Sequence, residues 1–282
     1  MSFSDSAGCL EEDLLKFFTS HEEDCFLLHT DILNWGPICQ EGSRTERLEK
    51  YYSLLNAASV DKTLFFPVFN YDYGKTRIFD VLEDKCQVGV LNEFVRLRNR
   101  ERRTRTPIFN FLEIPHDTFP KAPSSNPFGP GSLWDDLCRR EGRICFMGVV
   151  SETNTFTHFI EDEKQIGYRY YKRMPGIVRF NGVDEYVDFT FRVRPRVSEL
   201  VQYDWQGLNN ALERDGLLVR EPLGKGVILS YNAKKARDYL LEKLDDDEFF
   251  FLTEESRRKL SELRKSKPYP FRFEDFEQEA EK

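Results

Sequence analysis

The pattern of hydrophobic and polar residues predicts buried strands separated by amphipathic helices. Three apolar runs end abruptly at polar residues, which is typical of strands buried on both faces of a sheet. They are CFLLHTDIL (25–33), TLFFPVFN (63–70) and RICFMGVV (143–150). Helical periodicity is found at residues 10–20, 43–58, 88–99, 132–142, 199–215 and 232–245. This alternation predicts an α/β fold with a mixed, largely parallel central sheet flanked by helices.

The pattern changes between about residues 165 and 195, where short runs of β-forming residues replace the long apolar runs. Turns are expected at Pro175-Gly176 and at Asn181-Gly182, and the Asn-Gly pair favours a hairpin. We therefore predict a single domain over residues 1–264 with a small antiparallel insertion at about 165–195. Residues 265–282 are expected to form a charged tail.

Composition narrows the range of functions. The chain has 282 residues, 41 basic against 49 acidic, and a formal net charge of −8. An acidic chain is a poor general nucleic-acid binder, because such proteins use surplus positive charge. The 25 Phe, 12 Tyr and 3 Trp residues argue against disorder and for a well-packed core, or for an aromatic-lined ligand cleft.

Neither a secretory signal nor a membrane-spanning run is evident, which predicts a cytoplasmic protein without a membrane partner. The six cysteines are scattered and are expected to be free thiols. The four histidines show no ligand spacing, so no metal is expected. The oligomeric state is left open.

Polar residues that follow the buried strands are the first candidates for a site, because ligands of α/β proteins collect beyond the carboxyl ends of strands. Three such segments are His29-Thr30-Asp31, Asn70-Tyr71-Asp72 and residues 151–161. His29 can also be a core histidine bonded to the backbone, and Thr30 or Asp31 a helix cap. Asn70 and Asp72 are candidates for substrate binding.

The segment SETNTFTHFIE (151–161) is the most informative. If it begins a helix, Thr155, His158 and Glu161 follow one another along one face. A carboxylate one turn from the imidazole can fix its tautomer and support the charge that forms when it accepts a proton. Asn154 or Thr155 is a suitable N-cap. An ordinary surface histidine at a helix start remains the alternative.

One basic run stands out in this acidic chain, RLRNRERRTR (96–105). It is consistent with a solvated helix end or with a site for the phosphates of a coenzyme or nucleotide.

Six motifs in order resemble the aminoglycoside 3-N-acetyltransferase family, also called the antibiotic N-acetyltransferases. LLHTDILNWGPI (27–38) is similar to its opening strand and His-Ser-Ser-like turn, DKTLFFPVF (61–69) to its G-T-L-x-x-P segment, and VGVLNEFVR (88–96) to G-x-L-x-E-x-x-R. FGPGSLWDDL (128–137) resembles G-x-G-S-P-x-x-x-L. GRICFMGVVSETNTFTHFIE (142–161) resembles the strand and T-x-x-H-x-x-E block. Arg105-Thr106-Pro107 is shorter than the usual R-S-x-x-P.

The resemblance implies an α/β fold unrelated to the GNAT acetyltransferases, an acyl-CoA donor and a primary amine acceptor. It assigns His158 as catalytic general base with Glu161 behind it. It assigns the coenzyme contacts to two sets of residues, the turn His29, Thr30 and Asp31, and the segment Arg105 and Thr106. Thr155 is expected beside the reacting carbonyl.

The acceptor and the acyl group are less defined. The donor is expected to be acetyl-CoA or a short hydroxyacyl-CoA. Arginines and aromatics favour a nucleotide-linked amino sugar of surface-polysaccharide synthesis as acceptor. An aminoglycoside acceptor, as in antibiotic resistance, is the alternative, and a catalytically inactive CoA- or sugar-binding protein is a third.

Overall fold

The central element is a six-stranded mixed sheet. The computed structural model describes residues 3–36, 38, 42–119, 122–149, 151–197 and 200–277. The strand order of the sheet is β4-β2-β1-β5-β9-β8. β1 is parallel to both β2 and β5, and antiparallel pairs lie at both ends of the sheet. The strands are β1 (Cys25–Thr30), β2 (Thr63–Pro67), β4 (Phe111–Ile114), β5 (Arg143–Met147), β8 (Val219–Leu223) and β9 (Gly226–Asn232). The predicted mixed α/β architecture is confirmed.

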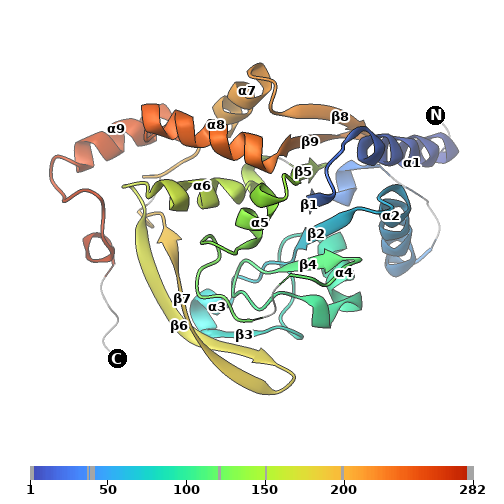
Figure 1. Cartoon of the computed structure of the whole chain (residues 1–282), viewed down its shortest axis with the longest axis horizontal. Coiled ribbons are helices and arrows are strands. Elements are labelled where there is room, and N and C mark those ends of the chain that lie inside the picture. Colours follow the sequence, from blue (N-terminus) through green and yellow to red (C-terminus); the bar gives the residue numbers. More distant parts are fainter. Residues whose placement is uncertain are drawn as a thin grey trace.

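Helices cover both faces of this sheet (Figure 1). Alternate residues of β1 belong to different core clusters, Leu27 to one and Phe26 and Leu28 to the other, as a period of two requires. The face of Phe26 packs on α1 (Phe3–Ser20), α2 (Arg44–Ala58) and α4 (Val90–Arg98). The opposite face packs on α5 (Leu133–Arg139), α6 (Phe156–Lys164) and α8 (Ala233–Asp246). β1, β2 and β5 were recognisable from the sequence because both of their faces are buried.

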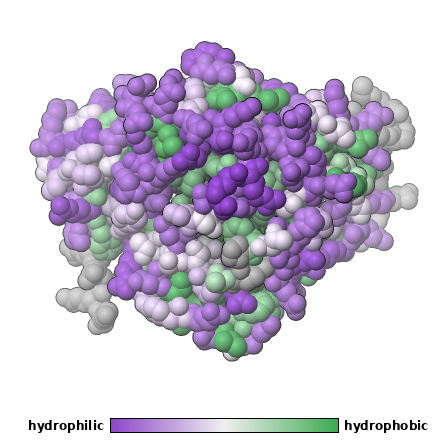
Figure 2. Space-filling model, in the orientation of Figure 1, coloured by the Kyte–Doolittle hydropathy of each residue, from purple (hydrophilic) through white to green (hydrophobic). Residues whose placement is uncertain are grey.

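The remaining helical elements lie around this framework. α7 (Trp205–Arg214) and α9 (Glu254–Leu263) lie with α8 along one side of the molecule (Figure 1). Short elements are α3 (Tyr73–Thr76), η1 (Ile32–Asn34), η2 (Arg100–Arg102), η3 (Ser151–Thr153) and η4 (Phe273–Asp275). Hydrophilic side chains cover much of the face shown in Figure 2, including the region of α8 and α9. Among the described helices, none has the length and apolar character needed to cross a bilayer.

A long hairpin forms a second sheet with a short strand, in the order β3-β6-β7. It consists of β3 (Ile78–Asp80), β6 (Tyr170–Phe180) and β7 (Val183–Val193). The Asn181-Gly182 turn predicted from the sequence is present, with φ values of 50° and 74°. The predicted turn at Pro175-Gly176 is wrong, because β6 runs straight through it. A Cβ on Gly176 would lie 2.3 Å from the Arg77 carbonyl oxygen, so this glycine permits close packing rather than a turn.

The charged C-terminal segment packs against the hairpin as far as residue 277. Phe271 is buried, and the hydroxyl of Tyr170 donates to Glu277 over 2.6 Å. Residues 278–282 of the expected tail lie outside the described part of the chain.

Candidate active site

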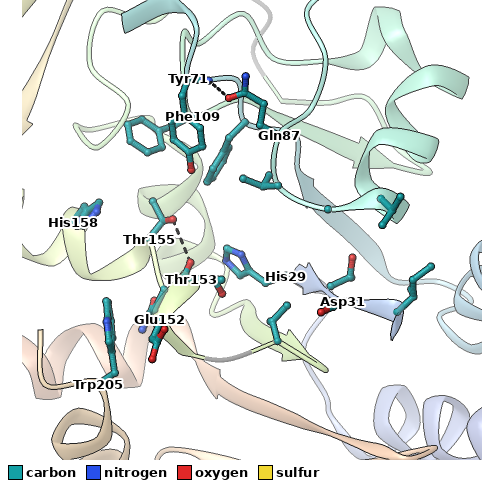
Figure 3. A pocket seen from close by; sticks show the side chains of 18 residues that line it. His29, Asp31, Tyr71, Gln87, Phe109, Glu152, Thr153, Thr155, His158 and Trp205 are labelled. Carbon is teal, nitrogen blue, oxygen red and sulfur yellow. Dashed lines mark hydrogen bonds between the residues drawn. The ribbon is translucent and has the colours of Figure 1, made fainter. Parts of the chain in front are cut away.

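A cavity of about 670 Å³ opens beyond the carboxyl ends of the central strands, and we call it the strand-end cavity. Figure 3 shows His158 at one end of it, Asp31 at the other and His29 between them. It is bounded by the end of β1, the start of α4 and the start of α6. Its lining residues are His29, Thr30, Asp31, Ile32, Phe69, Tyr71, Gln87, Val88, Gly89, Val90, Phe109, Val149, Glu152, Thr153, Asn154, Thr155, His158 and Trp205.

A second cavity, of about 1010 Å³, lies beside the end of β7 and the loop that follows it, and we call it the hairpin cavity. Its lining residues are Phe109, Glu152, His158, Arg169, Phe191, Val193, Arg194, Pro195, Arg196, Val197, Val201, Gln202, Tyr203 and Trp205. Four residues line both cavities, namely Phe109, Glu152, His158 and Trp205. His158 therefore borders both cavities.

His158 lies in the first turn of α6, as the sequence predicted. Thr155 occupies the N-cap position without a side-chain capping bond, and its hydroxyl points to the Thr153 carbonyl at 3.4 Å. The Nδ1 atom of His158 lies 3.3 Å from a carboxylate oxygen of Glu161 and 2.8 Å from Nη2 of Arg169. Because Nδ1 faces these buried groups, Nε2 is the nitrogen left to face the cavities.

Glu161 is the centre of a buried polar network. Its side chain is fully buried, and Nε of Arg169 lies 2.7 Å from it. The hydroxyls of Tyr168 and Tyr203 donate to the same carboxylate over 2.6 and 2.9 Å. Burial by itself raises the pKa of Glu161, but the charge of Arg169 and the hydrogen bonds outweigh burial, so the pKa is lowered. Glu161 is thus held as a carboxylate behind His158.

His158 is a neutral imidazole near pH 7. Burial is the main cause that lowers its pKa to about 4, and the charge of Arg169 acts in the same direction. Glu161 opposes both effects. The ring is nevertheless 27% exposed, which keeps it reachable from the cavities.

The turn after β1 lines the strand-end cavity and is held in place by hydrogen bonds. The hydroxyl of Thr30 donates to Asn92 over 2.7 Å, and the Asn92 amide donates to the Pro67 carbonyl, which ties β1 to α4 and β2. Asp31 caps η1 by accepting from the backbone N–H of Leu33. These contacts confirm the capping role that the sequence left open for Asp31.

His29 is the second buried histidine of the cavity. Its ring stacks on Phe146 with centroids 5.1 Å apart, and its Nε2 has no partner among the described residues. Burial lowers the pKa of His29 to about 4, so this ring is also neutral. A buried ring nitrogen without a partner, beside a cavity, is suited to a hydrogen bond with a ligand.

Besides the buried Glu161, four predicted site residues line neither cavity. Arg105 pairs with Glu185 at 3.1 Å and lies over the ring of Phe180, and Thr106 follows it on the same segment. Asn70 and Asp72 bond to each other around Tyr71, since the Asp72 N–H donates to Asn70. Arg105, Asn70 and Asp72 thus bond within the protein, although Tyr71 itself lines the strand-end cavity.

The arginine run at 96–105 is largely used within the protein. Arg96 and Arg103 are buried, and they bind Glu93 and the carbonyl oxygens of residues 68, 81, 82 and 84. Arg98 and Arg100 pair with exposed carboxylates. A phosphate site on this run, one of the two interpretations of the sequence, is therefore not supported.

Sequence reasoning missed Arg169, Tyr203, Trp205 and Glu152. Arg169 and Tyr203 are 11 and 45 residues beyond His158 and belong to no motif, so only the fold brings them to it. No group of three or more potential metal ligands is found among the residues that the structure describes.

Comparison with known proteins identifies the family of this chain. A family model described as aminoglycoside 3-N-acetyltransferase matches residues 67–245. Fold and family together define an N-acetyltransferase that is unrelated to the GNAT enzymes. The chain belongs to the aminoglycoside 3-N-acetyltransferase family, as the sequence motifs predicted.

Solved structures share the fold at low identity. A histidine-to-alanine mutant of aminoglycoside acetyltransferase AAC(3)-IVa, in complex with a gentamicin, is 17% identical over 93% of this chain and 97% of that chain, with a TM-score of 0.69. AAC-IIIb, as a binary complex with CoASH, is 15% identical over 88% and 97%, with a TM-score of 0.68. The YokD protein from Bacillus subtilis is 13% identical over 86% and 93%, with a TM-score of 0.63. None of the curated protein sequences matches this chain significantly.

Proposed function

We propose that this protein transfers the acetyl group of acetyl-CoA to a primary amine of an amino sugar, with His158 as general base. One observation carries the proposal, namely that His158 lies on the wall shared by the two cavities. A thioester in one cavity and an amine in the other would meet at its ring. Holding two reactants in this way is itself a large part of catalysis.

The strand-end cavity is the proposed donor site. It combines apolar side chains with a few polar groups, which suits the amide-containing arm of a coenzyme A thioester. Gly89 precedes α4 with φ 126°, and a Cβ there would press on the Thr30 carbonyl at 3.3 Å. This leaves the N-terminus of α4 open to a phosphate. The partnerless Nε2 of His29 and the turn Thr30-Asp31 complete the proposed coenzyme contacts.

The chemistry follows from the ionisation of the two groups. An amine is protonated near pH 7 and must lose its proton before it attacks a carbonyl carbon. The ammonium loses this first proton to solvent. Nε2 of His158 accepts a second proton, which the nitrogen gives up as it bonds to the acyl carbon, when the ring carries its own proton on Nδ1, where Glu161 is the nearby acceptor. The amine nitrogen bonds to the acyl carbon, the carbon–sulfur bond breaks, and the thiol leaves with the proton from the imidazolium.

Thr155 and the N-terminus of α6 are the proposed stabilisers of the negative charge on the carbonyl oxygen. A cysteine nucleophile is not needed. Burial raises the pKa of Cys25 and Cys86 to about 11 and that of Cys138 to about 12, so these thiols are not activated.

Of the two acceptor classes that the sequence left open, aminoglycosides are the one that the comparisons support, because solved structures of the same fold hold them. We therefore take an aminoglycoside as the first acceptor to test. The nucleotide-linked amino sugar and the longer acyl donors have no support from the comparisons.

The test follows thiol release from acetyl-CoA with aminoglycosides and with nucleotide-linked amino sugars as acceptors. We expect turnover by the wild type and a loss of at least about 100-fold in kcat for His158→Ala, with acetyl-CoA affinity retained. His116→Ala is the matched control, because His116 is exposed and lines neither cavity. An undiminished His158→Ala variant would show that the ring is not the base. A wild type that binds CoA but never releases thiol would favour the inactive binding protein.

A further inference from the structure

Two arginines of the hairpin cavity are placed to bind a ligand. Arg194 and Arg196 follow β7 on either side of the buried Pro195, and both are exposed and line the cavity. Nη1 of Arg194 bonds weakly to the Val201 carbonyl at 3.3 Å, which fixes its position. Neither guanidinium lies within 4 Å of a carboxylate on any residue that the structure describes.

The other arginines of this region are already used by the protein. Arg169 is neutralised by the buried Glu161. Arg192 is buried and donates to Gln165 and to backbone carbonyls, over the ring of Tyr171. Arg194 and Arg196 therefore differ from Arg169 and Arg192 in being exposed, although the charge of Arg196 also acts on Glu277 of the C-terminal segment.

The charges of the two cavities are opposite. Among the described residues that line the hairpin cavity, Glu152 is the only acid, against the two open arginines. The described lining of the strand-end cavity includes Asp31 and Glu152 and contains no lysine or arginine. A polycationic acceptor in the hairpin cavity would meet two like charges, which opposes binding.

Two aromatic residues, Tyr203 and Trp205, also line the hairpin cavity. Tyr203 and Trp205 stack with ring centroids 4.8 Å apart and an interplanar angle of 29°. Trp205 also lines the wall next to His158. A sugar or base ring that packs on Trp205 would lie in the same cavity as His158 and the two arginines.

We infer that the acceptor is an amine that carries a phosphate or carboxylate group, bound by Arg194 and Arg196 in the hairpin cavity. This rests on the proposed function for the reaction and for the hairpin cavity as the acceptor site, but it replaces the aminoglycoside with an anionic acceptor. Guanidinium groups pair with these anions through charge-assisted, often bidentate hydrogen bonds. The acceptor would thus be selected by its anionic group as well as by its amine.

A matched acceptor series tests the inference. It compares glucosamine, glucosamine 1-phosphate and the amino-uronic acid of glucosamine with an aminoglycoside, at constant acetyl-CoA. We expect kcat/KM to be at least about 10-fold higher for the better anionic sugar than for glucosamine, because one charge-assisted hydrogen bond contributes about that factor. Comparing kcat/KM for the phosphate sugar and the carboxylate sugar identifies which anion is preferred. Preference for glucosamine or the aminoglycoside would overturn the inference.

Arg194→Ser and Arg196→Ser locate the effect. Each is expected to raise KM for the anionic sugar about 10-fold and to leave KM for glucosamine and acetyl-CoA unchanged. Arg173→Ser is the control, since Arg173 is an exposed arginine of the same hairpin that lines neither cavity. A rise in KM for acetyl-CoA instead would assign the arginines to the donor and overturn the inference.

Direct binding separates this inference from the proposed chemistry. Calorimetry of glucosamine 1-phosphate with the wild-type protein saturated with CoA needs no turnover. Binding that weakens about 10-fold in Arg194→Ser supports the anion site even if no acetyl transfer occurs. Equal binding of glucosamine and its phosphate would reject the site even in an active enzyme.

Discussion

Nη2 of Arg169 lies 2.8 Å from Nδ1 of His158, which makes the arginine a donor to the ring nitrogen that faces the interior. A guanidinium has no acceptor, so Nδ1 must use its lone pair in this contact. The neutral ring then carries its proton on Nε2. For His158 to accept a proton at Nε2, its own proton has to be on Nδ1, where Glu161 lies at 3.3 Å. Arg169 and Glu161 thus favour opposite tautomers of the same histidine.

The first prediction concerns this tautomer. In the free protein, the contact with Arg169 should hold His158 with Nδ1 unprotonated and Nε2 protonated. Nitrogen-15 NMR of histidine-labelled protein distinguishes the two, and His158→Ala assigns the signals. Binding of CoA and an acceptor should move the population toward protonated Nδ1 if His158 is the base. A free protein already protonated at Nδ1 would show that Glu161, and not Arg169, sets the resting tautomer.

The pH dependence of turnover is the second prediction. The pKa of His158 is lowered to about 4 by burial and by Arg169, so the ring is neutral throughout pH 5–9. Loss of activity on acidification should therefore follow protonation of the acceptor amine, well above pH 5. The logarithm of kcat/KM should rise with pH until the pKa of the acceptor and should shift when an acceptor of different pKa is used. An acid limb near 6.5 that is independent of the acceptor would contradict a buried, low-pKa histidine.

Third, Glu161→Gln should destabilise the fold as well as slow catalysis. The change leaves Arg169 buried without a counter-charge, and breaking a buried ion pair costs about 3–5 kcal/mol. Urea unfolding would measure this loss. Glu163→Gln is the control, because Glu163 lies on the same helix but pairs with Arg237 near the surface, where a change of about 1 kcal/mol or less is expected. Similar losses in both variants would mean that Glu161 is not stabilised by the buried network.

The sequence predicted those parts of the protein that depend on local pattern. The strands at 25–30, 63–67 and 143–147 were visible because they are apolar on both faces, and His158 with Glu161 because a helix brings positions three apart together. Arg169 and Tyr203 reach His158 only through the hairpin and the loop after it, and their sequence spacing contains no signal. The turn predicted at Pro175-Gly176 was wrong because the sequence does not distinguish a glycine required for close packing from a glycine required for a turn.

The fourth prediction links His29 to acid stability. Burial lowers its pKa from an ordinary value of 6.5 to about 4, so the unfolded state binds a proton at a pH where the folded state does not. The stability contributed by the neutral ring is complete above pH 6.5 and is lost as the pH falls toward 4, by about 3 kcal/mol. His29→Phe, which keeps the stack on Phe146, should remove this part of the pH dependence in urea unfolding between pH 7.5 and 4.5. The exposed His116→Phe should leave the slope unchanged, and equal slopes in all three proteins would refute the assignment.

The last prediction concerns the floor of the strand-end cavity. Gly148 has φ 71°, and a Cβ there would lie 2.7 Å from the Asp31 carbonyl oxygen and 2.8 Å from the Trp35 ring. Gly131 has a similar φ of 79°, but a Cβ there meets nothing within 4 Å. Both alanine variants should lose about 1 kcal/mol of stability because of the left-handed backbone.

Gly148→Ala alone must also displace the turn that carries Asp31. We therefore expect Gly148→Ala to unfold at lower urea than Gly131→Ala and to raise KM for acetyl-CoA, because the turn is part of the proposed donor site. Equal KM values in the two variants would place the donor elsewhere, whatever their stabilities.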